Sequence, residues 1–193
     1  MRVSKFEDPD KFVESEGVKH STQVKKNATR AKKAQRKRQI KIIKRLMPKA
    51  HSILCIGARD DSEVLSFIKA GFYTMGIDVT PESIYVRKMD AHKMTFGKNT
   101  FDFIYASHLL EHLHDPVLVM QKIREISKYG IFIMLPPQKD PRRGHPANFD
   151  MMGSPPTEYT VPDKDFDAFG PNHKIVHYKV GRREFEMMFT WED

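Results

Sequence analysis

Short apolar runs alternate with stretches of helical spacing through the centre of this chain, and this alternation limits the possible folds more than any other feature. Ser52 to Gly57 is a nearly continuous apolar run, which is typical of a parallel strand buried on both faces. A helix is predicted from Asp60 to Ala70 and another from Pro116 to Ser127. Further strands are predicted at 72–78, 85–89, 101–106 and 131–135. Repeated strand, helix and strand units indicate a parallel sheet with right-handed crossovers.

The C-terminal part has a different character. Eight of the twelve prolines lie between Pro136 and Pro171, which predicts a long Pro-rich loop without regular elements. Apolar and polar residues then alternate through Val176 to Val180 and through Phe185 to Trp191, on either side of Gly181-Arg182-Arg183. This pattern predicts an antiparallel hairpin. We therefore expect an α/β fold, a Rossmann-like three-layer sandwich with a mostly parallel sheet and a C-terminal antiparallel hairpin.

The N-terminal part separates into an arm and a helix. Residues 1 to about 22 are polar and show no sustained period, whereas Val24 to Met47 contains no glycine or proline and ends before Pro48. We divide the chain into an N-terminal arm with a basic helix, residues 1–50, and one α/β domain, residues 51–193, which includes the Pro-rich loop at 136–171.

Positive charge is concentrated in this N-terminal helix. Between Gly17 and Arg59 there are thirteen basic residues, at positions 19–49, and no acidic residue. Three interpretations stay open: a solvated charged surface, contact with nucleic acid, and a nuclear-targeting run in K-K-A-Q-R-K-R. No aromatic residue lies within the segment, so nucleic acid would be held by its backbone and not read by base stacking.

Several protein classes are disfavoured. No apolar run approaches the roughly 20 residues that span a bilayer, and the first twenty residues carry acids, among them Asp8, Asp10, Glu14 and Glu16, in place of a signal-peptide apolar stretch. Cys55 is the only cysteine, so no intramolecular disulfide can form, which agrees with a reducing compartment. We expect a soluble cytoplasmic protein without membrane contacts, with a nuclear location open if the host is eukaryotic.

Polar residues follow the predicted strands at the edge where open parallel sheets bind ligands. Gly57 ends the first strand and begins a turn into a helix N-terminus, whose N–H groups favour a carboxylate. Asp78 ends the second strand, 21 residues later, and this position suits an acidic residue that accepts hydrogen bonds from both hydroxyls of a ribose. Asp90 follows the third strand, where a carboxylate can accept from an exocyclic amine, and Ser107 follows the fourth. The pattern predicts a nucleoside across this edge.

Four blocks of sequence carry a resemblance to a known family. They are I-L-C-I-G, G-I-D-V, D-A-H-K-M-T-F and F-D-F-I-Y-A-S-H-L-L-E-H-L-H-D-P, followed by a helix and a fifth strand. The last block is the most specific, because a Phe-Asp strand start and a Leu-Glu-His ending seldom occur together. With these blocks, the roughly 85 residues from Ile53 to Pro137 resemble the class I S-adenosylmethionine-dependent methyltransferases, particularly the small methyltransferase-domain group.

The resemblance implies S-adenosylmethionine as the cofactor and assigns residues to it. It places Gly57, Ala58 and Arg59 against the cofactor, Asp78 and Val79 at its ribose, Asp90 and Ala91 beside its adenine, and Ser107, His108 and Leu109 along its methionine portion. The candidate catalytic residues are His108 and His112, and His145 is a further candidate for substrate handling. A structural role capping the turn is the alternative for His112.

The chain departs from the family pattern at three places. Arg59 and Asp61 stand where relatives carry glycines of a G-x-G-x-G turn, and we hypothesise that Arg59 instead meets the cofactor's carboxylate. The twelve-residue interval from Asp78 to Asp90 is too short for a crossover helix and a strand, so a single turn is expected there. Lys128-Tyr129-Gly130 replaces the usual glycine pair before the fifth strand.

Other motif readings are weaker. His108 to His112 matches the H-x-x-E-H zinc-protease signature, but that signature needs one long helix, so we expect no metal. Leu135-Pro136-Pro137-Gln138 is similar to a D/N-P-P-Y motif but follows the wrong strand, and a chain-reversing loop is the simpler reading. A nicotinamide dinucleotide site would need the missing glycines to seat a pyrophosphate.

We expect an S-adenosylmethionine-dependent methyltransferase that acts on an unidentified acceptor, with nucleic acid or a nucleic-acid-associated molecule among the candidates. The alternative is a catalytically inactive, methyltransferase-like binding protein whose basic N-terminal helix binds nucleic acid or an acidic partner. A third reading keeps the cofactor but cleaves or senses it.

Overall fold

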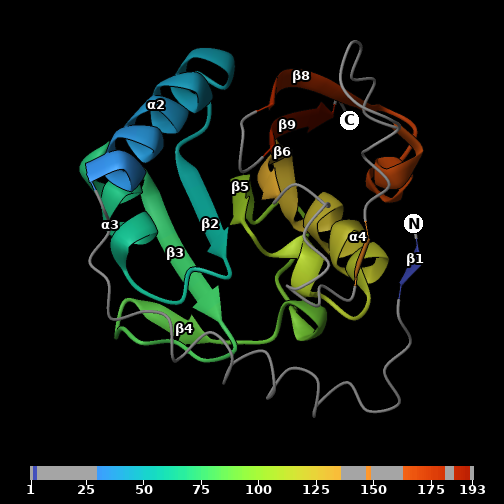
Figure 1. The fold of residues 1–193 in the computed structure, drawn as a ribbon, viewed down its shortest axis with the longest axis horizontal. Helices are drawn as coiled ribbons and strands as arrows, with labels where there is room; N and C mark the ends of the chain where they lie inside the picture. The colour runs from blue at the N-terminus through green and yellow to red at the C-terminus, as the bar shows by residue number, and fades with distance from the viewer. Residues whose placement is uncertain (1, 4–29, 136–146, 149–162, 181–184, 192–193) are drawn as a thin grey trace.

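A computed structural model describes residues 2–3, 30–135, 147–148, 163–180 and 185–191 (Figure 1). Within them, seven strands form one sheet: β2 (Ser52–Ile56), β3 (Tyr73–Asp78), β4 (Val86–Lys88), β5 (Phe101–Ser107), β6 (Ser127–Leu135), β8 (His173–Val180) and β9 (Phe185–Trp191). The helices are α2 (Arg30–Leu46), α3 (Ser62–Lys69) and α4 (Pro116–Ile126), with 3₁₀ turns η1 (Ala91–Lys93), η2 (Leu110–His112) and η4 (Asp163–Phe169). A separate pair consists of β1 (Arg2–Val3) and β7 (Ala147–Asn148).

The strand order is β4-β3-β2-β5-β6-β9-β8. The first five strands are parallel, whereas β9 runs antiparallel to both β6 and β8. The order reverses between β2 and β5, because the chain leaves β4 at one edge and returns on the far side of β2. The predicted fold class is confirmed, and this reversal defines the point where open α/β sheets bind ligands.

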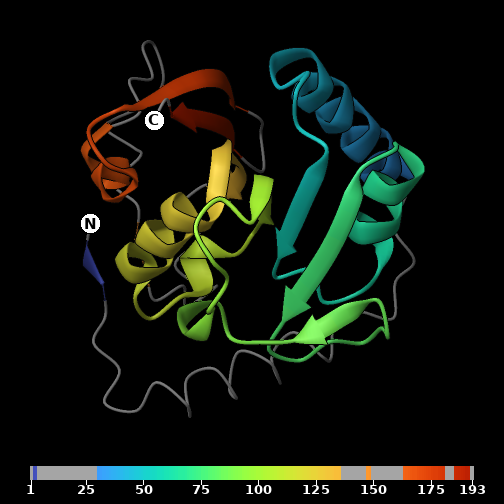
Figure 2. The same cartoon turned by 180° about the vertical axis from the view of Figure 1, so that it is seen from behind.

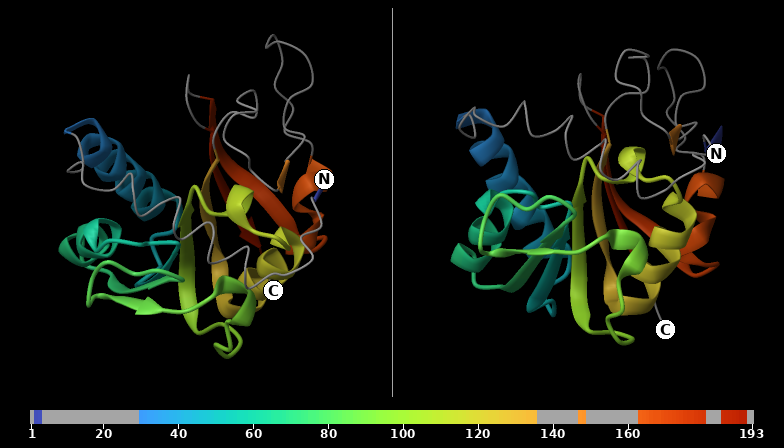
Figure 3. Two further views of the ribbon diagram at one scale, coloured as in Figure 1. Left: turned by 60° about the horizontal axis from the view of Figure 1, so that its bottom comes forward. Right: turned by 90° about the horizontal axis from the view of Figure 1, so that it is seen from below.

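Helices cover both faces of the sheet and make three layers (Figure 3). On one face α2 and α3 pack over Ile53, Cys55 and other buried residues, and on the other α4 and η4 pack over Leu54 and Ile56. Successive residues of β2 therefore enter different cores, as the period of a strand requires. A strand buried on both faces has no polar positions, which explains its continuous apolar run.

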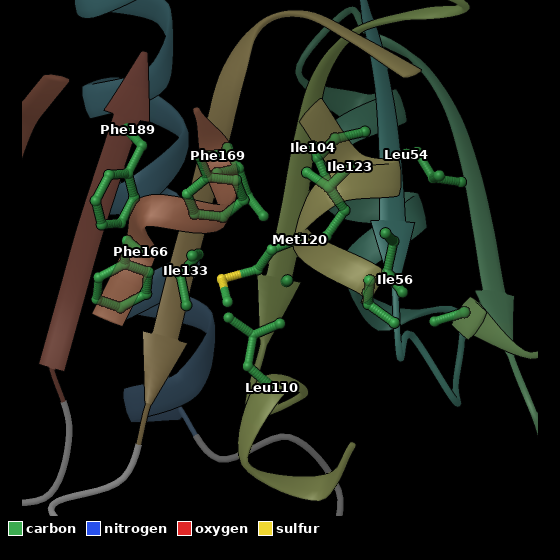
Figure 4. Packing of buried hydrophobic residues seen from close by; sticks show 14 of the residues in the cluster. Leu54, Ile56, Ile104, Leu110, Met120, Ile123, Ile133, Phe166, Phe169 and Phe189 are labelled. Atoms are coloured by element: carbon green, nitrogen blue, oxygen red, sulfur yellow. The ribbon is translucent and has the colours of Figure 1, made fainter. Parts of the chain in front are cut away.

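The structure places a regular element in part of the predicted Pro-rich loop. Residues 163–169 form η4, whose Phe166 and Phe169 are fully buried against Phe189 of β9 (Figure 4). The expectation of a loop throughout 136–171 is therefore wrong for this stretch, because two aromatic side chains bury enough apolar area to anchor it. Residues 136–146 and 149–162, with His145, and the turn residues Gly181-Arg182-Arg183, lie outside the described residues.

The fifth parallel strand is longer than predicted. It begins at Ser127, immediately after α4, and not at Ile131. Gly130 permits this, since a Cβ there would lie 2.1 Å from the carbonyl oxygen of Phe189 on β9. The single glycine of Lys128-Tyr129-Gly130 thus allows the close backbone approach that joins the C-terminal hairpin to the sheet.

The connection from β3 to β4 contains no helix, as the twelve-residue interval predicts. Consequently no crossover helix covers this part of the sheet within the described residues (Figure 2). Tyr73 on β3 is 82% exposed and Ile84 in the connection is 95% exposed. The shortened crossover leaves apolar side chains in water at this edge.

The basic helix packs against the sheet. Its described part, α2, ends at Leu46, and residues 24–29 of the predicted helix lie outside the described residues. Ile43 is fully buried and Gln39 is 1% exposed. Gln39 accepts a hydrogen bond from the hydroxyl of Tyr105 on β5 and donates one to Glu186 on β9. The division of the chain at residue 50 stays a prediction.

Among the helices of the described residues, none combines the length and the apolar character needed to span a membrane.

Candidate active site

A cleft opens at the carboxyl ends of β2, β3, β4 and β5, the switch point of the sheet. Its empty volume is about 940 Å³, including the space open to solvent at its mouth. Clefts of several hundred cubic ångströms are typical of small-molecule and cofactor sites. From the predicted set, the first strands contribute Gly57, Arg59, Asp78 and Val79. The later segments contribute Asp90, Ala91, Ser107, His108, Leu109 and His112.

Asp78 is held in place by backbone amides. Its Oδ2 accepts from the N–H of Arg59 at 3.1 Å, and its Oδ1 accepts from the N–H of Thr80 at 2.8 Å. These bonds fix the carboxylate at the end of β3, beside the turn that follows β2. Each oxygen of an ionised carboxylate has two acceptor sites, so both can also accept from a ligand hydroxyl.

Asp90 is oriented by His92, a residue that sequence reasoning did not single out. The backbone N–H of His92 donates to Oδ1 of Asp90 at 2.9 Å, and ring Nδ1 lies 2.8 Å from the same oxygen. His92 Nε2 is 3.4 Å from the N–H of Asp115, which can only donate, so Nδ1 carries the proton toward Asp90. Burial raises the pKa of Asp90, but the hydrogen bonds from His92 outweigh it and hold this pKa below its usual value.

The signal for His92 lies in its spacing. An Asp-x-His tripeptide at the end of a strand can form an Asx turn, in which the side-chain oxygen accepts from the amide two residues later. His92 is also nearly buried and stacks on His114 with ring centroids 3.8 Å apart. The sequence contains this tripeptide, but only packing shows that the ring turns back to the carboxylate.

The turn after β2 has an unusual backbone. Gly57 has a φ of 75° and Arg59 a φ of 42°, both in the left-handed region. Arg59 therefore adopts the conformation for which glycine is usually used, at an energetic cost. Its guanidinium donates to Glu82 Oε1 from Nε at 3.0 Å and from Nη2 at 2.7 Å, while Nη1 is buried without a partner in the described part of the chain.

The structure differs from two expectations about this turn. Ala58 is not brought into the cleft: its side chain is buried in the α2–α3 core, and its N–H donates to the carbonyl of Ile77. The helix N-terminus is also partly occupied, because Asp60 Oδ1 accepts from the N–H of Ser62 at 2.8 Å. Asp60, which precedes the N-cap residue Asp61, thus competes with a ligand carboxylate for one of these donors.

The end of β5 brings histidine and glutamate together. His108 has a φ of 53°, a strained conformation for a residue with a side chain, and its ring lines the cleft. Its Nδ1 lies 3.2 Å from Oε1 of Glu111, whose side chain is 4% exposed. Glu111 Oε2 is buried without a hydrogen-bond partner in the described part of the chain. A buried carboxylate that accepts from Nδ1–H leaves Nε2 as the basic nitrogen of the ring.

The H-x-x-E-H sequence is not on one helix. His108 follows β5, and only residues 110–112 form the short turn η2, so the two histidines do not lie one turn apart on a helix. Among the described residues, no group of three or more His, Cys, Asp or Glu side chains gathers to hold a metal. His112 lines the cleft, and its backbone N–H donates to the carbonyl of Leu109 at 2.9 Å.

Several solved structures share this fold. The 1,6-didemethyltoxoflavin-N1-methyltransferase of Burkholderia thailandensis is 14% identical with a TM-score of 0.72, covering 98% of this chain and 93% of its own. Magnesium protoporphyrin IX methyltransferase of Synechocystis PCC 6803 is 9% identical with a TM-score of 0.62 and 95% coverage of both chains. An S-adenosylmethionine-dependent methyltransferase from Aquifex aeolicus is 16% identical with a TM-score of 0.52, covering 83% of this chain and 98% of its own.

The first of these structures holds 1,6-didemethyltoxoflavin and S-adenosylhomocysteine, and the second holds S-adenosylmethionine. No curated protein sequence matches the chain. The strand order, in which β9 lies in the sixth position and runs antiparallel to its neighbours, is the fold that these methyltransferases share, and the cleft lies at its switch point. A family model described as a methyltransferase domain matches residues 27–153. The chain belongs to this methyltransferase-domain family.

Proposed function

We propose that this protein binds S-adenosylmethionine in the cleft at the carboxyl ends of β2 to β5 and transfers its methyl group to an acceptor beside His108. One observation carries the proposal: Asp78, the last residue of β3, and Asp90, two residues after the neighbouring strand β4, line a single cleft. Two carboxylates at adjacent strand ends can accept from the ribose hydroxyls and from the exocyclic amine of one adenosine.

The adenosine part of the site is formed by prepositioned acceptors. Asp78 is fixed by the backbone N–H groups of Arg59 and Thr80 and would hold the ribose. Both hydrogen bonds from His92 go to Oδ1 of Asp90, so Oδ2 would accept from the adenine amine. Val79 and Ala91 adjoin these acids in the cleft wall and would contact the sugar and the ring.

The methionine part of the site lies at the ends of β2 and β5. Gly57 has no side chain, and a Cβ there would come within 3.2 Å of Leu109, so the glycine keeps this part of the cleft open. Ser107 to Leu109 line the opposite wall. Nη1 of Arg59 is buried without a partner in the described part of the chain, and following the hypothesis drawn from the sequence it would donate to the cofactor's carboxylate.

Bound S-adenosylmethionine supplies a methyl group on a positively charged sulfur, which any well-placed nucleophile can displace. The chain's contribution is then to position the acceptor and exclude water, and both effects supply much of the rate of such a displacement. Where the acceptor must lose a proton, Nε2 of His108 would take it, because Glu111 holds the Nδ1 proton. His112 is the second candidate, since it lines the same cleft.

Calorimetric titration of the full chain with S-adenosylhomocysteine tests the proposal. We expect micromolar binding that falls about 10- to 100-fold in Asp78→Asn, since a carboxylate acceptor for two hydroxyls is lost. The matched control is Asp102→Asn. Asp102 also accepts from two backbone amides, those of His51 and Ser52, but it lies near the start of β5, at the end of the sheet away from the cleft. Unchanged binding in Asp78→Asn, or equal losses in both variants, would contradict the proposal.

The alternative of a catalytically inactive binding protein rests on the altered glycine turn. Arg59 occupies a left-handed position that its side chain strains, and Asp60 already accepts from the start of α3. The same titration separates the two functions: absence of any S-adenosylhomocysteine binding by the folded full chain would favour the inactive protein. Incubation with labelled S-adenosylmethionine and cell extract would then identify the acceptor class, nucleic acid included.

A further inference from the structure

The outer face of α2 carries an unbroken row of cations. Lys33, Lys37, Lys41 and Arg45 are spaced four residues apart, and all are exposed. Residues at this spacing form a ridge along a helix, with neighbours about 6 Å apart along the axis. We name these four residues the basic ridge. It spans about 18 Å, a length over which a nucleic-acid strand presents several phosphates.

The acids near α2 are used on its inner face and not on the ridge. Arg36 lies 3.7 Å from Glu63 of α3, and Arg38 is paired with Glu186 of β9. In the described part of the chain, the three ridge lysines have no ion pair and no hydrogen bond. Their charge is therefore not neutralised by the fold.

This arrangement opposes the stability of the helix itself. Like charges four residues apart repel each other across one turn. The first turn of α2 contains Arg30, Lys32 and Lys33 and no acid, whereas the helix dipole favours negative charge at that end. An anionic partner along the ridge would remove both penalties, so α2 is better suited to a complex than to solvent.

Strand β8 adds charge to the same side of the sheet. Lys179 is exposed and pairs in register with Glu186, whose carboxylate contacts α2, so both side chains face the α2 layer. Arg38 and Arg45 lie close enough to His177 of β8 to affect its ionisation. The positive surface thus extends from the ridge to the edge strand.

The composition of α2 decides which polyanion fits. A helix that binds a membrane inserts its apolar face into lipid, but the apolar face of α2, with Ile43, is buried against the sheet. The helix contains no aromatic residue that could stack on a base. We propose that the basic ridge, together with Lys179, binds the phosphate backbone of a nucleic acid without reading its sequence.

The ridge is separate from the cleft. No residue of α2 lines the cleft, which lies at the carboxyl ends of the parallel strands. Contact with the ridge would therefore hold the protein on a nucleic acid without delivering a base to the cleft. The inference does not depend on methyl transfer, so it is tested separately.

Fluorescence anisotropy with labelled 20-base-pair duplexes of unrelated sequence, at several NaCl concentrations, tests the proposal on the full chain. Each phosphate contact contributes about 0.9 to the slope of log affinity against log salt. We expect the triple variant Lys33→Gln, Lys37→Gln, Lys41→Gln to lower this slope by about 3 and to weaken binding at least about 10-fold at 50 mM salt. The Lys→Arg triple variant should keep the affinity, because it keeps the charge.

The matched control removes the same charge from another surface, by Arg87→Gln, Lys88→Gln and Lys98→Gln, which are all exposed. Equal losses in the two triple variants would overturn the proposal, as would an affinity for the duplexes that salt does not change. Binding of polyglutamate or phosphatidylserine vesicles as tightly as the duplex would assign the ridge to another partner and also overturn it. Unchanged S-adenosylhomocysteine binding in the ridge variant shows that the variant is folded and that the two sites are independent.

Discussion

The carboxylate of Asp78, at the end of β3, accepts a hydrogen bond from the backbone N–H of Arg59, in the turn that follows β2, at 3.1 Å. This bond joins two neighbouring strands at the switch point of the sheet. Arg59 has a left-handed backbone conformation, at the position where the family resemblance predicts glycine. A residue assigned to the ribose therefore also maintains the geometry of the turn.

Two substitutions of Arg59 distinguish the effect of its backbone conformation from the effect of its side chain. Both Arg59→Gly and Arg59→Ala remove the pair with Glu82, but only glycine adopts a φ of 42° without strain. We expect the glycine variant to be more stable than the alanine variant by about 1 kcal/mol, the reverse of the order in ordinary helical positions. Urea denaturation measures this difference, and equal stabilities would contradict the strained turn.

The same two variants test the hypothesis that Arg59 meets the cofactor's carboxylate. Both remove the buried Nη1 donor, so S-adenosylhomocysteine affinity should fall about 10-fold in each. Unchanged affinity in both variants would remove the hypothesis and leave Arg59 as a structural partner of Glu82.

His92→Phe should change how S-adenosylhomocysteine binding depends on pH. In the native chain, hydrogen bonds from His92 hold the pKa of Asp90 below its usual value, so the carboxylate stays charged and affinity stays constant down to about pH 5. Phenylalanine keeps a ring beside His114 but removes the side-chain bond, and burial then raises the pKa of Asp90. We expect the affinity of this variant to begin to fall at a higher pH than that of the native protein as the solution is acidified.

Titration across pH 4.5 to 8 measures this effect. His51→Phe is the control, because His51 is exposed at the opposite edge of the sheet. A pH profile of His92→Phe that matches the native protein would show that His92 does not orient Asp90.

Glu63 makes stability depend on pH near neutrality. Its side chain is 14% exposed in the α2–α3 layer, and burial raises its pKa from 4.5 to about 7 despite the nearby Arg36. Between these values the folded state binds a proton that the unfolded state has lost, so stability falls as pH rises through this window and levels off above it.

Glu63→Gln should remove this contribution. We expect the loss of unfolding free energy between pH 5 and pH 8 to be smaller in the variant by at most about 3 kcal/mol. Urea denaturation of both proteins at pH 5 and at pH 8 measures this difference. Subtracting the two results removes the pH dependence of the ionisable groups that both proteins share. An identical pH dependence in both proteins would show that Glu63 ionises in the folded chain as it does in the unfolded one.

Tyr105→Phe tests how α2 is held on the sheet. The hydroxyl of Tyr105 donates to Gln39 Oε1 at 2.8 Å, and both residues are buried. Removing the donor leaves a buried amide oxygen unpaired, which costs about 1–3 kcal/mol. Thermal or urea unfolding measures the loss, and Tyr85→Phe, at an exposed tyrosine, should leave stability within about 0.5 kcal/mol. A neutral Tyr105→Phe would mean that packing of Ile43 alone holds α2.

The parallel core and the end of the sheet at which the cleft opens could be predicted from local pattern alone. A strand buried on both faces, such as 52–56, must be apolar at every position, and the acids that follow strands must lie at one edge. The interval from Asp78 to Asp90 predicted the missing helix because chain length sets a lower limit on any crossover. These inferences need only periodicity, length and residue type.

Contacts between residues far apart in the sequence could not be predicted. The sequence showed that Arg59 stands where the family pattern predicts glycine. The ion pair of Arg59 with Glu82 and the hydrogen bond from its N–H to Asp78 could not be predicted, because they depend on how the β3–β4 connection folds back. The burial of Phe166 and Phe169 could not be predicted for the same reason. A proline-rich segment shows no periodicity from which its packing partner could be inferred.

The sequence alone determined the order of strands and helices along the chain, the end of the sheet at which the cleft opens and the concentration of charge in the N-terminal helix, because each depends on the spacing of neighbouring residues. The tertiary structure decided which nitrogen of His92 faces Asp90, that Ala58 is turned into the core, and that the lysines of α2 face outward while its arginines Arg36 and Arg38 pair inward. Those outcomes depend on which surfaces the packed layers bury, and burial is a property of the whole fold.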